Sequence, residues 1–284
     1  MRTLVTGATG RVGSRFVPRL LRDPSVERVR VLARDPAKAA VLPGGVEVVP
    51  GDITEATARA EALSGVDAVV HLAANLRGGD PEAMPRVNVD GTAGLARDAL
   101  AAGARRFVFI STNLVYGAGG GRPAAEDDPV HPAGSFGPYP KSKVDAEQAL
   151  LRLHRQHGLP LRILRSAFVY GEGDPHLEES LRWASEWAAH KRLHMVHHAD
   201  VAQALLRLLH ANGVDGRVYN VADDAPVTAL ELFELNGREP PAEVGTRPLD
   251  QPWEGIVSTR RIRAELGFRP IYPTAWSAWH AGAL

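Results

Sequence analysis

The chain has 284 residues, 44% of them hydrophobic, and is therefore long and apolar enough to bury a sizeable core. Its 33 Lys and Arg residues balance 33 Asp and Glu residues, so no overall field attracts nucleic acid or a membrane surface, and we expect neither as a partner. It has no cysteine, which excludes thiol chemistry and disulfides. It also has no signal-peptide pattern and no apolar run of ~18 residues, so we expect a soluble, cytoplasmic protein.

Short apolar strands alternate with helical segments through the first half of the chain. We expect strands at residues 3–6, 29–32, 46–49, 68–72, 107–110 and 161–164, and helices at 12–21, 85–102 and 138–156. Short apolar strands separated by amphipathic helices are typical of a parallel sheet that is covered on both faces. The pattern predicts an α/β fold with a doubly wound parallel sheet of the Rossmann type.

The alternation breaks down after Gly171, where short elements are joined by proline-rich segments at 239–241 and 247–252. We therefore expect two parts. Residues 1–171 form a dinucleotide-binding Rossmann domain, and residues 172–284 form a small substrate lobe interleaved with the final elements of that domain.

A glycine-rich turn stands between the first strand and the first helix. Three glycines, Gly7, Gly10 and Gly13, would let the turn be tight, let the backbone approach a pyrophosphate and let the helix pack closely on the strand. The N-terminus of the helix would then favour the anion. The predicted cofactor-binding residues here are Gly7, Thr9, Gly10, Arg11, Val12 and Gly13. The alternative is a glycine-rich turn without a ligand.

This Gly-x-x-Gly-x-x-Gly spacing resembles that of the extended short-chain dehydrogenase/reductases, the NAD(P)-dependent epimerase/dehydratase family. The resemblance covers nearly the whole chain, and later motifs match in order at residues 52–53, 71–74, 88–92, 169–171 and 198–202. It implies that Asp52 and Ile53 contact the adenine. It also implies that the end of the fourth strand lies beside the cofactor, at Leu72, Ala73 and Ala74.

A tyrosine and a lysine lie four residues apart at Tyr139 and Lys143, on one face of the predicted helix. A phenol with a pKa near 10 is a poor base at neutral pH, and a neighbouring ammonium favours the phenolate. The resemblance implies a catalytic triad of Thr112, Tyr139 and Lys143, in which Lys143 also anchors the cofactor ribose. Ser111 is the alternative to Thr112.

The end of the second strand bears on the choice of cofactor. Arg34 occupies the position at which NAD-specific enzymes usually present a carboxylate to the ribose diol, and Arg11 and Lys38 lie nearby. Guanidinium groups pair well with phosphate, so the sequence favours NADP. NAD is the alternative, with Asp35 binding the diol.

The sequence departs from the family that it resembles at two candidate substrate contacts. The family's dehydratases carry two carboxylates after the catalytic threonine, whereas this chain has Asn113 and Leu114, which disfavours elimination. The nucleotide-sugar enzymes usually carry an asparagine where Phe168 stands. The segments around residues 171–198 and 234–252 are also short, which argues against a nucleoside diphosphate in the substrate.

Four histidines lie at positions 190, 194, 197 and 198, and a spacing of four would suit a metal site on a helix. Residues 193–197 read as a strand, however, and no carboxylate motif accompanies the histidines. We therefore predict no metal and expect solvated or capping histidines. The resemblance also implies a homodimer through the helices at 85–102 and 138–156. An apolar stripe of Val144, Leu150 and Leu151 permits that interface, but it could equally face the sheet.

Taken together, these features predict an NAD(P)-dependent oxidoreductase that transfers a hydride between the nicotinamide and an alcohol or carbonyl group of a small molecule, with sugar-like compounds among the candidates. The first alternative is a nucleotide-sugar epimerase that uses the same triad. The second is a binding protein that senses NADP without turnover, and the Tyr139–Lys143 pair argues against it.

Overall fold

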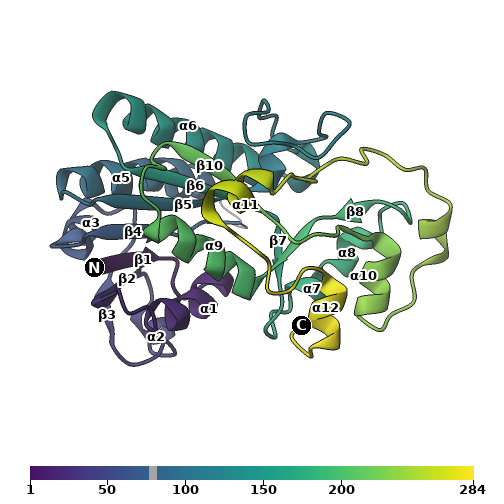
Figure 1. Ribbon diagram of the computed structural model, residues 1–284, viewed down its shortest axis with the longest axis horizontal. Coiled ribbons are helices and arrows are strands. Elements are labelled where there is room, and N and C mark those ends of the chain that lie inside the picture. Colours follow the sequence, from purple (N-terminus) through teal and green to yellow (C-terminus); the bar gives the residue numbers. More distant parts are fainter. Residues whose placement is uncertain (77–81) are drawn as a thin grey trace. The chain divides into compact units, whose positions relative to one another are not determined.

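The computed structural model describes residues 1–76 and 82–284 (Figure 1). One sheet has seven strands in the order β10-β6-β5-β4-β1-β2-β3. These strands are β1 (Arg2–Thr6), β2 (Arg28–Ala33), β3 (Val46–Pro50), β4 (Ala68–His71), β5 (Arg106–Thr112), β6 (Leu161–Ser166) and β10 (Arg217–Val221). β1 pairs in parallel with both β2 and β4. The pairs β2–β3 and β4–β5 are also parallel. The predicted doubly wound α/β fold is confirmed, and the strand order reverses beside β1, where such sheets bind ligands.

Helices cover both faces of this sheet (Figure 1). They are α1 (Arg11–Leu20), α2 (Pro36–Ala39), α3 (Ala56–Leu63), α4 (Ala83–Pro85), the π-helix η1 (Arg86–Gly91), α5 (Thr92–Ala101), α6 (Tyr139–His157) and α9 (His198–His210). The helix expected at 85–102 is confirmed, since α4, η1 and α5 follow one another without a break over residues 83–101; its π-helical turn was not predicted. Among the described residues, no helix is long and apolar enough to cross a membrane.

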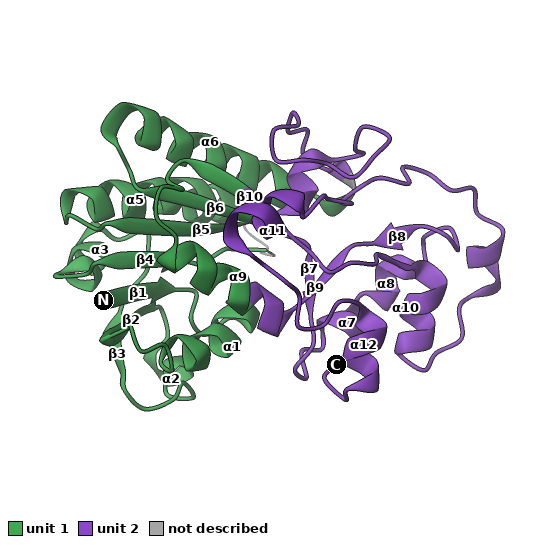
Figure 2. Cartoon of the chain, viewed as in Figure 1, with its two compact units in different colours: residues 1–111, 136–164, 202–218 green, residues 112–135, 165–201, 219–284 purple. Residues whose placement is uncertain are grey.

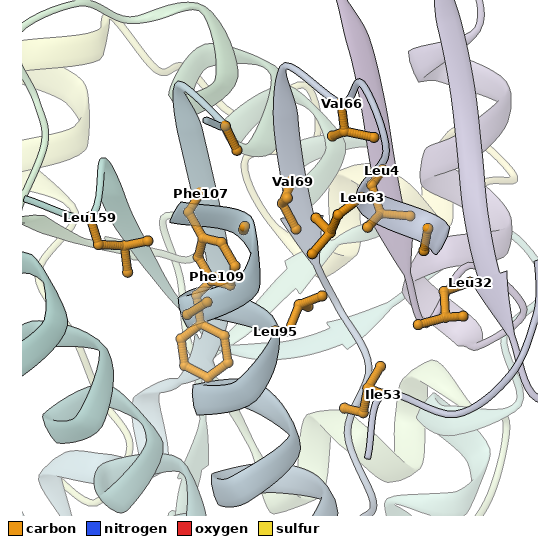
Figure 3. Close-up of a cluster of buried hydrophobic side chains, with 14 of the residues drawn as sticks. Leu4, Leu32, Ile53, Leu63, Val66, Val69, Leu95, Phe107, Phe109 and Leu159 are labelled. Atoms are coloured by element: carbon orange, nitrogen blue, oxygen red, sulfur yellow. The ribbon is translucent and has the colours of Figure 1, made fainter. Parts of the chain in front are cut away.

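A hydrophobic core fills the space between the sheet and helices α3, α5 and α6 (Figure 3). Strand residues such as Val69 and Phe107 meet Leu63 and Leu95 from the helices, and all four are fully or almost fully buried. Leu150 of α6 belongs to the same cluster, with Leu151 packed against it. These two side chains of the apolar stripe thus face the core of the chain itself, and the homodimer stays a prediction.

The chain divides into two compact units (Figure 2). Unit 1 comprises residues 1–111, 136–164 and 202–218, and unit 2 comprises residues 112–135, 165–201 and 219–284. Each unit therefore collects alternating segments of the sequence. The domain boundary expected at residue 171 stays a prediction.

Unit 2 contains two small sheets and several short helices. Its strands are β7 (Phe168–Tyr170) with β9 (Met195–His197), in parallel, and β8 (Arg192–Leu193) with β11 (Val227–Thr228), antiparallel. Its helices are α7 (His176–Glu179), α8 (Leu181–Ala184), α10 (Ala229–Leu235), α11 (Arg260–Leu266) and α12 (Ala275–His280), with 3₁₀ turns η2 (Asn113–Tyr116) and η4 (Ala242–Gly245); a further turn, η3 (Gly134–Phe136), lies at the unit boundary. The single strand expected at 193–197 is wrong, since β8 and β9 pair with different partners.

Candidate active site

The glycine turn joins β1 to α1 within unit 1, and its glycines are required by close backbone contacts. Gly7 has a φ of +71°, and a Cβ there would lie 2.5 Å from the backbone nitrogen of Ala73. A Cβ on Gly13 would lie 2.2 Å from the carbonyl oxygen of Gly7. The backbone amide of Gly10 donates to that same oxygen over 3.0 Å. Side chains at Gly7 and Gly13 would clash with the protein's own backbone, so the turn can be this tight only with glycine at both positions.

The helix N-terminus beside this turn suits an anion. Gly10 is the N-cap of α1, and no side chain caps the helix. The positive end of the helix dipole and the first amide groups favour a phosphate at such a position. The turn therefore fits the pyrophosphate of a dinucleotide, with the predicted residues Thr9, Arg11 and Val12 at the start of the helix.

Two charged residues meet near the ends of β2 and β3. The side chain of Arg34 is 76% exposed, and its Nε lies 3.7 Å from Oδ2 of Asp52. Asp35 has a local role, because its Oδ1 accepts the amide of Ala37 and caps α2. Ile53 is buried in the core cluster next to this corner. Arg34 thus presents an exposed guanidinium just after the end of β2, beside the carboxylate of Asp52.

The end of β4 is held against the glycine turn by a buried histidine. His71 is fully buried; its Nδ1 lies 2.6 Å from Oγ1 of Thr6 and its Nε2 lies 2.8 Å from Oγ1 of Thr92. Burial lowers the pKa of His71 to about 3, so the ring is neutral. The amide of Leu72 donates to the carbonyl oxygen of Thr6 over 3.1 Å. Leu72, Ala73 and Ala74 therefore follow β1 past the glycines.

Asn88 connects this loop to the helix that carries Tyr139, a role that the sequence interpretation missed. It lies in the π-helix η1, and its side chain makes two hydrogen bonds with the backbone of Asn75, of 2.7 and 2.9 Å. Its Nδ2 also donates to Oγ of Ser142 over 3.0 Å, and that hydroxyl donates to the carbonyl of Tyr139 over 2.7 Å. π-Helical turns are frequent at functional sites. The family signature at 88–92 was the available signal.

Tyr139 and Lys143 lie one turn apart on α6, also in unit 1. Lys143 is only 2% exposed, and its Nζ lies 4.1 Å from the ring centroid of Phe109. Burial lowers the pKa of Lys143 to about 7, against the opposing effect of the Glu147 carboxylate. Burial raises the pKa of Tyr139 to about 12. The phenol is thus protonated at neutral pH and can donate a proton.

Thr112 ends β5 and belongs to unit 2. Its Oγ1 accepts the amide of Leu114 over 3.3 Å and donates to Oδ1 of Asn113 over 3.4 Å. The amide group of Asn113 donates in turn to the carbonyl oxygen of Gly255. Ser111 is also buried, and its Oγ has no hydrogen-bond partner among the described residues. Asn113 therefore orients the Thr112 hydroxyl, while the catalytic choice between Thr112 and Ser111 stays a prediction.

The histidines are more buried than expected. His197 does act as a cap, since its Nδ1 accepts the amide of Ala199. The expectation is wrong for His194 and His198, which are 5% and 2% exposed. His198 Nε2 lies 2.8 Å from the carboxylate of Asp174. Within residues 1–76 and 82–284, no group of three or more histidine or acidic side chains could hold a metal ion.

Comparison with known proteins identifies the family. Residues 3–222 match the NAD dependent epimerase/dehydratase family. A dTDP-glucose 4,6-dehydratase of Streptomyces griseus is 31% identical over 96% of this chain and 90% of its own. A 4-hydroxy-2-methyl-3-oxo-4-farnesyl-3,4-dihydroquinoline-1-oxide ketoreductase of Stigmatella aurantiaca is 29% identical over 99% and 80%.

A solved structure is similar along the whole chain. It is a dTDP-glucose 4,6-dehydratase from Streptomyces venezuelae with NAD and TYD bound, 28% identical, with a TM-score of 0.79 over 99% of this chain and 97% of that one. The fold, the glycine turn and the family match agree. The protein belongs to the NAD dependent epimerase/dehydratase family and is an NAD(P)-dependent enzyme.

Proposed function

We propose that the protein transfers a hydride between a nicotinamide dinucleotide and an alcohol or carbonyl carbon of a small substrate. The observation that carries this proposal is the buried ammonium group of Lys143, one helical turn from Tyr139. A buried lysine contributes little to stability, because desolvation disfavours its charge. It is well suited to stabilise a phenolate on the same helix face.

The cofactor fits the residues of unit 1 and supplies the hydride when bound. The glycine turn would hold its pyrophosphate, Asp52 and Ile53 its adenine, and Lys143 its ribose. In the reductive direction the Tyr139 hydroxyl gives its proton to the substrate oxygen, and the Lys143 charge stabilises the phenolate that remains. The Thr112 hydroxyl would hydrogen-bond to the same substrate oxygen.

Oxidation or reduction is favoured over elimination. Elimination needs a general acid and a general base near the reacting carbons. Asn113 and Leu114 stand where the family's dehydratases carry carboxylates, and neither exchanges a proton. The amide of Asn113 is moreover engaged with Gly255. The similarity to a ketoreductase supports simple carbonyl reduction for this chain.

The cations of unit 2 favour a compact substrate without a nucleoside diphosphate. Lys191 donates to Oε2 of Glu254 over 2.8 Å, with side chains only 12% and 8% exposed. The guanidinium of Arg192 lies 5.0 Å above the ring of Trp253 and donates to the carbonyl of Pro252. Because Lys191 and Arg192 are engaged with these protein groups, neither is free to pair with a diphosphate, and a buried diphosphate without cationic partners is costly to desolvate. Phe168 in place of an amide supports the same conclusion, and a monosaccharide-sized carbonyl compound fits it.

NADP is the favoured cofactor within this proposal. The exposed Arg34 guanidinium is positioned at the end of β2, where a 2′-phosphate would be paired. Asp35 caps α2 with its carboxylate, which weighs against its binding a ribose diol. NAD remains the alternative that a measurement of both dissociation constants decides.

The test is absorbance at the reduced-nicotinamide band with a panel of small ketones, aldehydes, sugars and nucleotide-sugars. Steady net conversion that depends on one carbonyl compound supports the oxidoreductase. Interconversion of a nucleotide-sugar without net cofactor change would establish the epimerase instead. Tight NADP binding with no turnover across the panel would favour the sensor.

A further inference from the structure

Three aromatic side chains from different elements of unit 2 stack on one another. They are Phe168 at the start of β7, His176 in α7 and Trp183 in α8. The rings of Phe168 and His176 lie 3.9 Å apart at 27°, and Trp183 meets both edge-on at 6.2 and 6.3 Å. All three are half-buried. We call Phe168, His176 and Trp183 the ring surface.

The ring surface is held in place by its surroundings. Nδ1 of His176 lies 3.1 Å from the carbonyl oxygen of Val169, which fixes the imidazole beside Phe168. The guanidinium of Arg182 lies 4.4 Å over the ring of Trp183. The edge-on arrangement of Trp183 against the other two rings is favourable for aromatic side chains. The surface is therefore preorganised, which reduces the entropy lost on binding a ligand.

The ring surface belongs to the same compact unit as Thr112. Thr112 is the last residue of β5, and Phe168 follows the end of β6, its neighbour in the sheet. A path of hydrogen bonds connects them. Asn113 accepts a hydrogen bond from the hydroxyl of Thr112 and donates one to the carbonyl oxygen of Gly255. Two residues after Gly255, the amide of Val257 donates to Nδ1 of His194 over 3.1 Å. The carbonyl oxygen of His194 in turn accepts the amide of Phe168 over 3.1 Å.

The chemistry of this surface selects rings over charged groups. Aromatic faces stack on flat rings and pack against the C–H faces of saturated rings. Diphosphates need several convergent donors, and a phenyl group at position 168 offers none. Lys191 and Arg192 are engaged elsewhere, and Arg182 brings one guanidinium to the ring surface, where it lies over the ring of Trp183. An extended flexible chain would lose more conformational freedom on such a surface than a ring would.

We propose that the ring surface binds the substrate, and that the substrate carries its carbonyl or hydroxyl on an uncharged ring that packs against Phe168 and Trp183. This inference rests on the proposed function, since it assigns a substrate class to the same site. His176, which stacks on Phe168, acts as a positioning residue.

The test uses two uncharged ketones with the same number of carbon atoms, the bicyclic 2-decalone and the open-chain 2-decanone. Calorimetric titration of the NADP⁺-loaded enzyme measures their binding without turnover. The ring surface predicts that 2-decalone binds more tightly than 2-decanone. Phe168→Leu and Trp183→Leu should each weaken the binding of 2-decalone by about tenfold, and leave the dissociation constant of NADP⁺ unchanged.

The matched control is Trp187→Leu, since Trp187 is also half-buried and, like Phe168, packs against the core of unit 2, but it is not one of the three stacked rings. Thermal unfolding of each variant shows that it folds, and Phe168→Tyr, which keeps the ring, should retain 2-decalone binding. Equal affinity for the two ketones, no binding of 2-decalone, or equal losses in all three leucine variants would each overturn the inference.

The two proposals fail differently. If 2-decalone binds through Phe168 and Trp183 but no ketone is ever reduced, the ring surface stands and the proposed hydride transfer falls. If a ketone is reduced with a rate that depends on Tyr139 while the ring-surface variants keep the wild-type dissociation constant, the inference falls and the proposed function stands.

Discussion

Replacing Lys143 by methionine should make the cofactor-free protein more stable at neutral and lower pH. The side chain is 2% exposed, and burial lowers its pKa from 10.5 to about 7. Each pKa unit corresponds to about 1.36 kcal/mol, so a shift of this size corresponds to a difference on the order of 5 kcal/mol between its two protonation states. Methionine keeps a similar length and apolar stem without the charge.

The sign follows from proton uptake. Between pH 7 and 10.5 the unfolded chain holds the lysine proton and the folded protein has released it, so the wild type gains stability as the pH rises through this window. Below pH 7 both states are protonated, and the folded state carries the full penalty of a buried ammonium. Lys143→Met should therefore raise Tm by roughly 10 °C at pH 6, at about 2 °C per kcal/mol, and by little at pH 10.

The assay is thermal unfolding of the cofactor-free wild type and variant from pH 6 to 10. Lys141→Met is the matched control, because Lys141 lies on the same helix, is 69% exposed and pairs with Asp145 over 2.6 Å. This control should give a small difference that does not grow at low pH. A Lys143→Met variant with a lower Tm than the wild type at pH 6, or with the same difference in Tm at pH 6 and pH 10, refutes the reasoning.

Three further predictions concern the two ligands. Arg34→Ala should weaken NADP binding by about 10- to 100-fold, which corresponds to the loss of one or two charge-assisted hydrogen bonds, and should change NAD binding little. Equal affinity of the wild type for both cofactors would count against NADP. Gly13→Ala places a methyl group 2.2 Å from the Gly7 carbonyl and should abolish cofactor binding, whereas Gly44→Ala, with nothing within 4 Å of its Cβ, should leave it intact. UDP-glucose and dTDP-glucose should show no micromolar binding to the cofactor-loaded enzyme by calorimetry, and tight binding with interconversion at a sugar carbon would promote the epimerase.

Local patterns predict the fold well where the cause is local. The strands near the N-terminus are short apolar runs, and the glycines at 7, 10 and 13 meet steric demands of the turn itself. β10 was not anticipated. Its Asn220 is fully buried and is satisfied by distant groups, among them the hydroxyl of Tyr116 and the carbonyl of Ala124, so its burial cannot be read from its neighbours in sequence.

The departures at the site have the same origin. The π-helical turn at 86–91 and the role of Asn88 depend on hydrogen bonds to Asn75 and Ser142, which periodicity does not reveal. Phe168 was singled out from its motif, but its partners His176 and Trp183 lie on helices of only four residues each. A helix that short gives no periodic signal in the sequence, and the stacking of the three rings arises only from tertiary contacts between separate elements.

The most direct test of hydride transfer with Tyr139 as the acid is a single-turnover measurement with a substrate found in the panel. Wild-type enzyme and Tyr139→Phe, each loaded with reduced cofactor, are mixed with the carbonyl compound, and the loss of reduced-nicotinamide absorbance is followed. The account predicts that the variant binds the cofactor with unchanged affinity. Its single-turnover rate should be lower by a factor on the order of 10² or more, because phenylalanine keeps the ring and removes the exchangeable proton. Wild-type single-turnover rates in the Tyr139→Phe variant would contradict it.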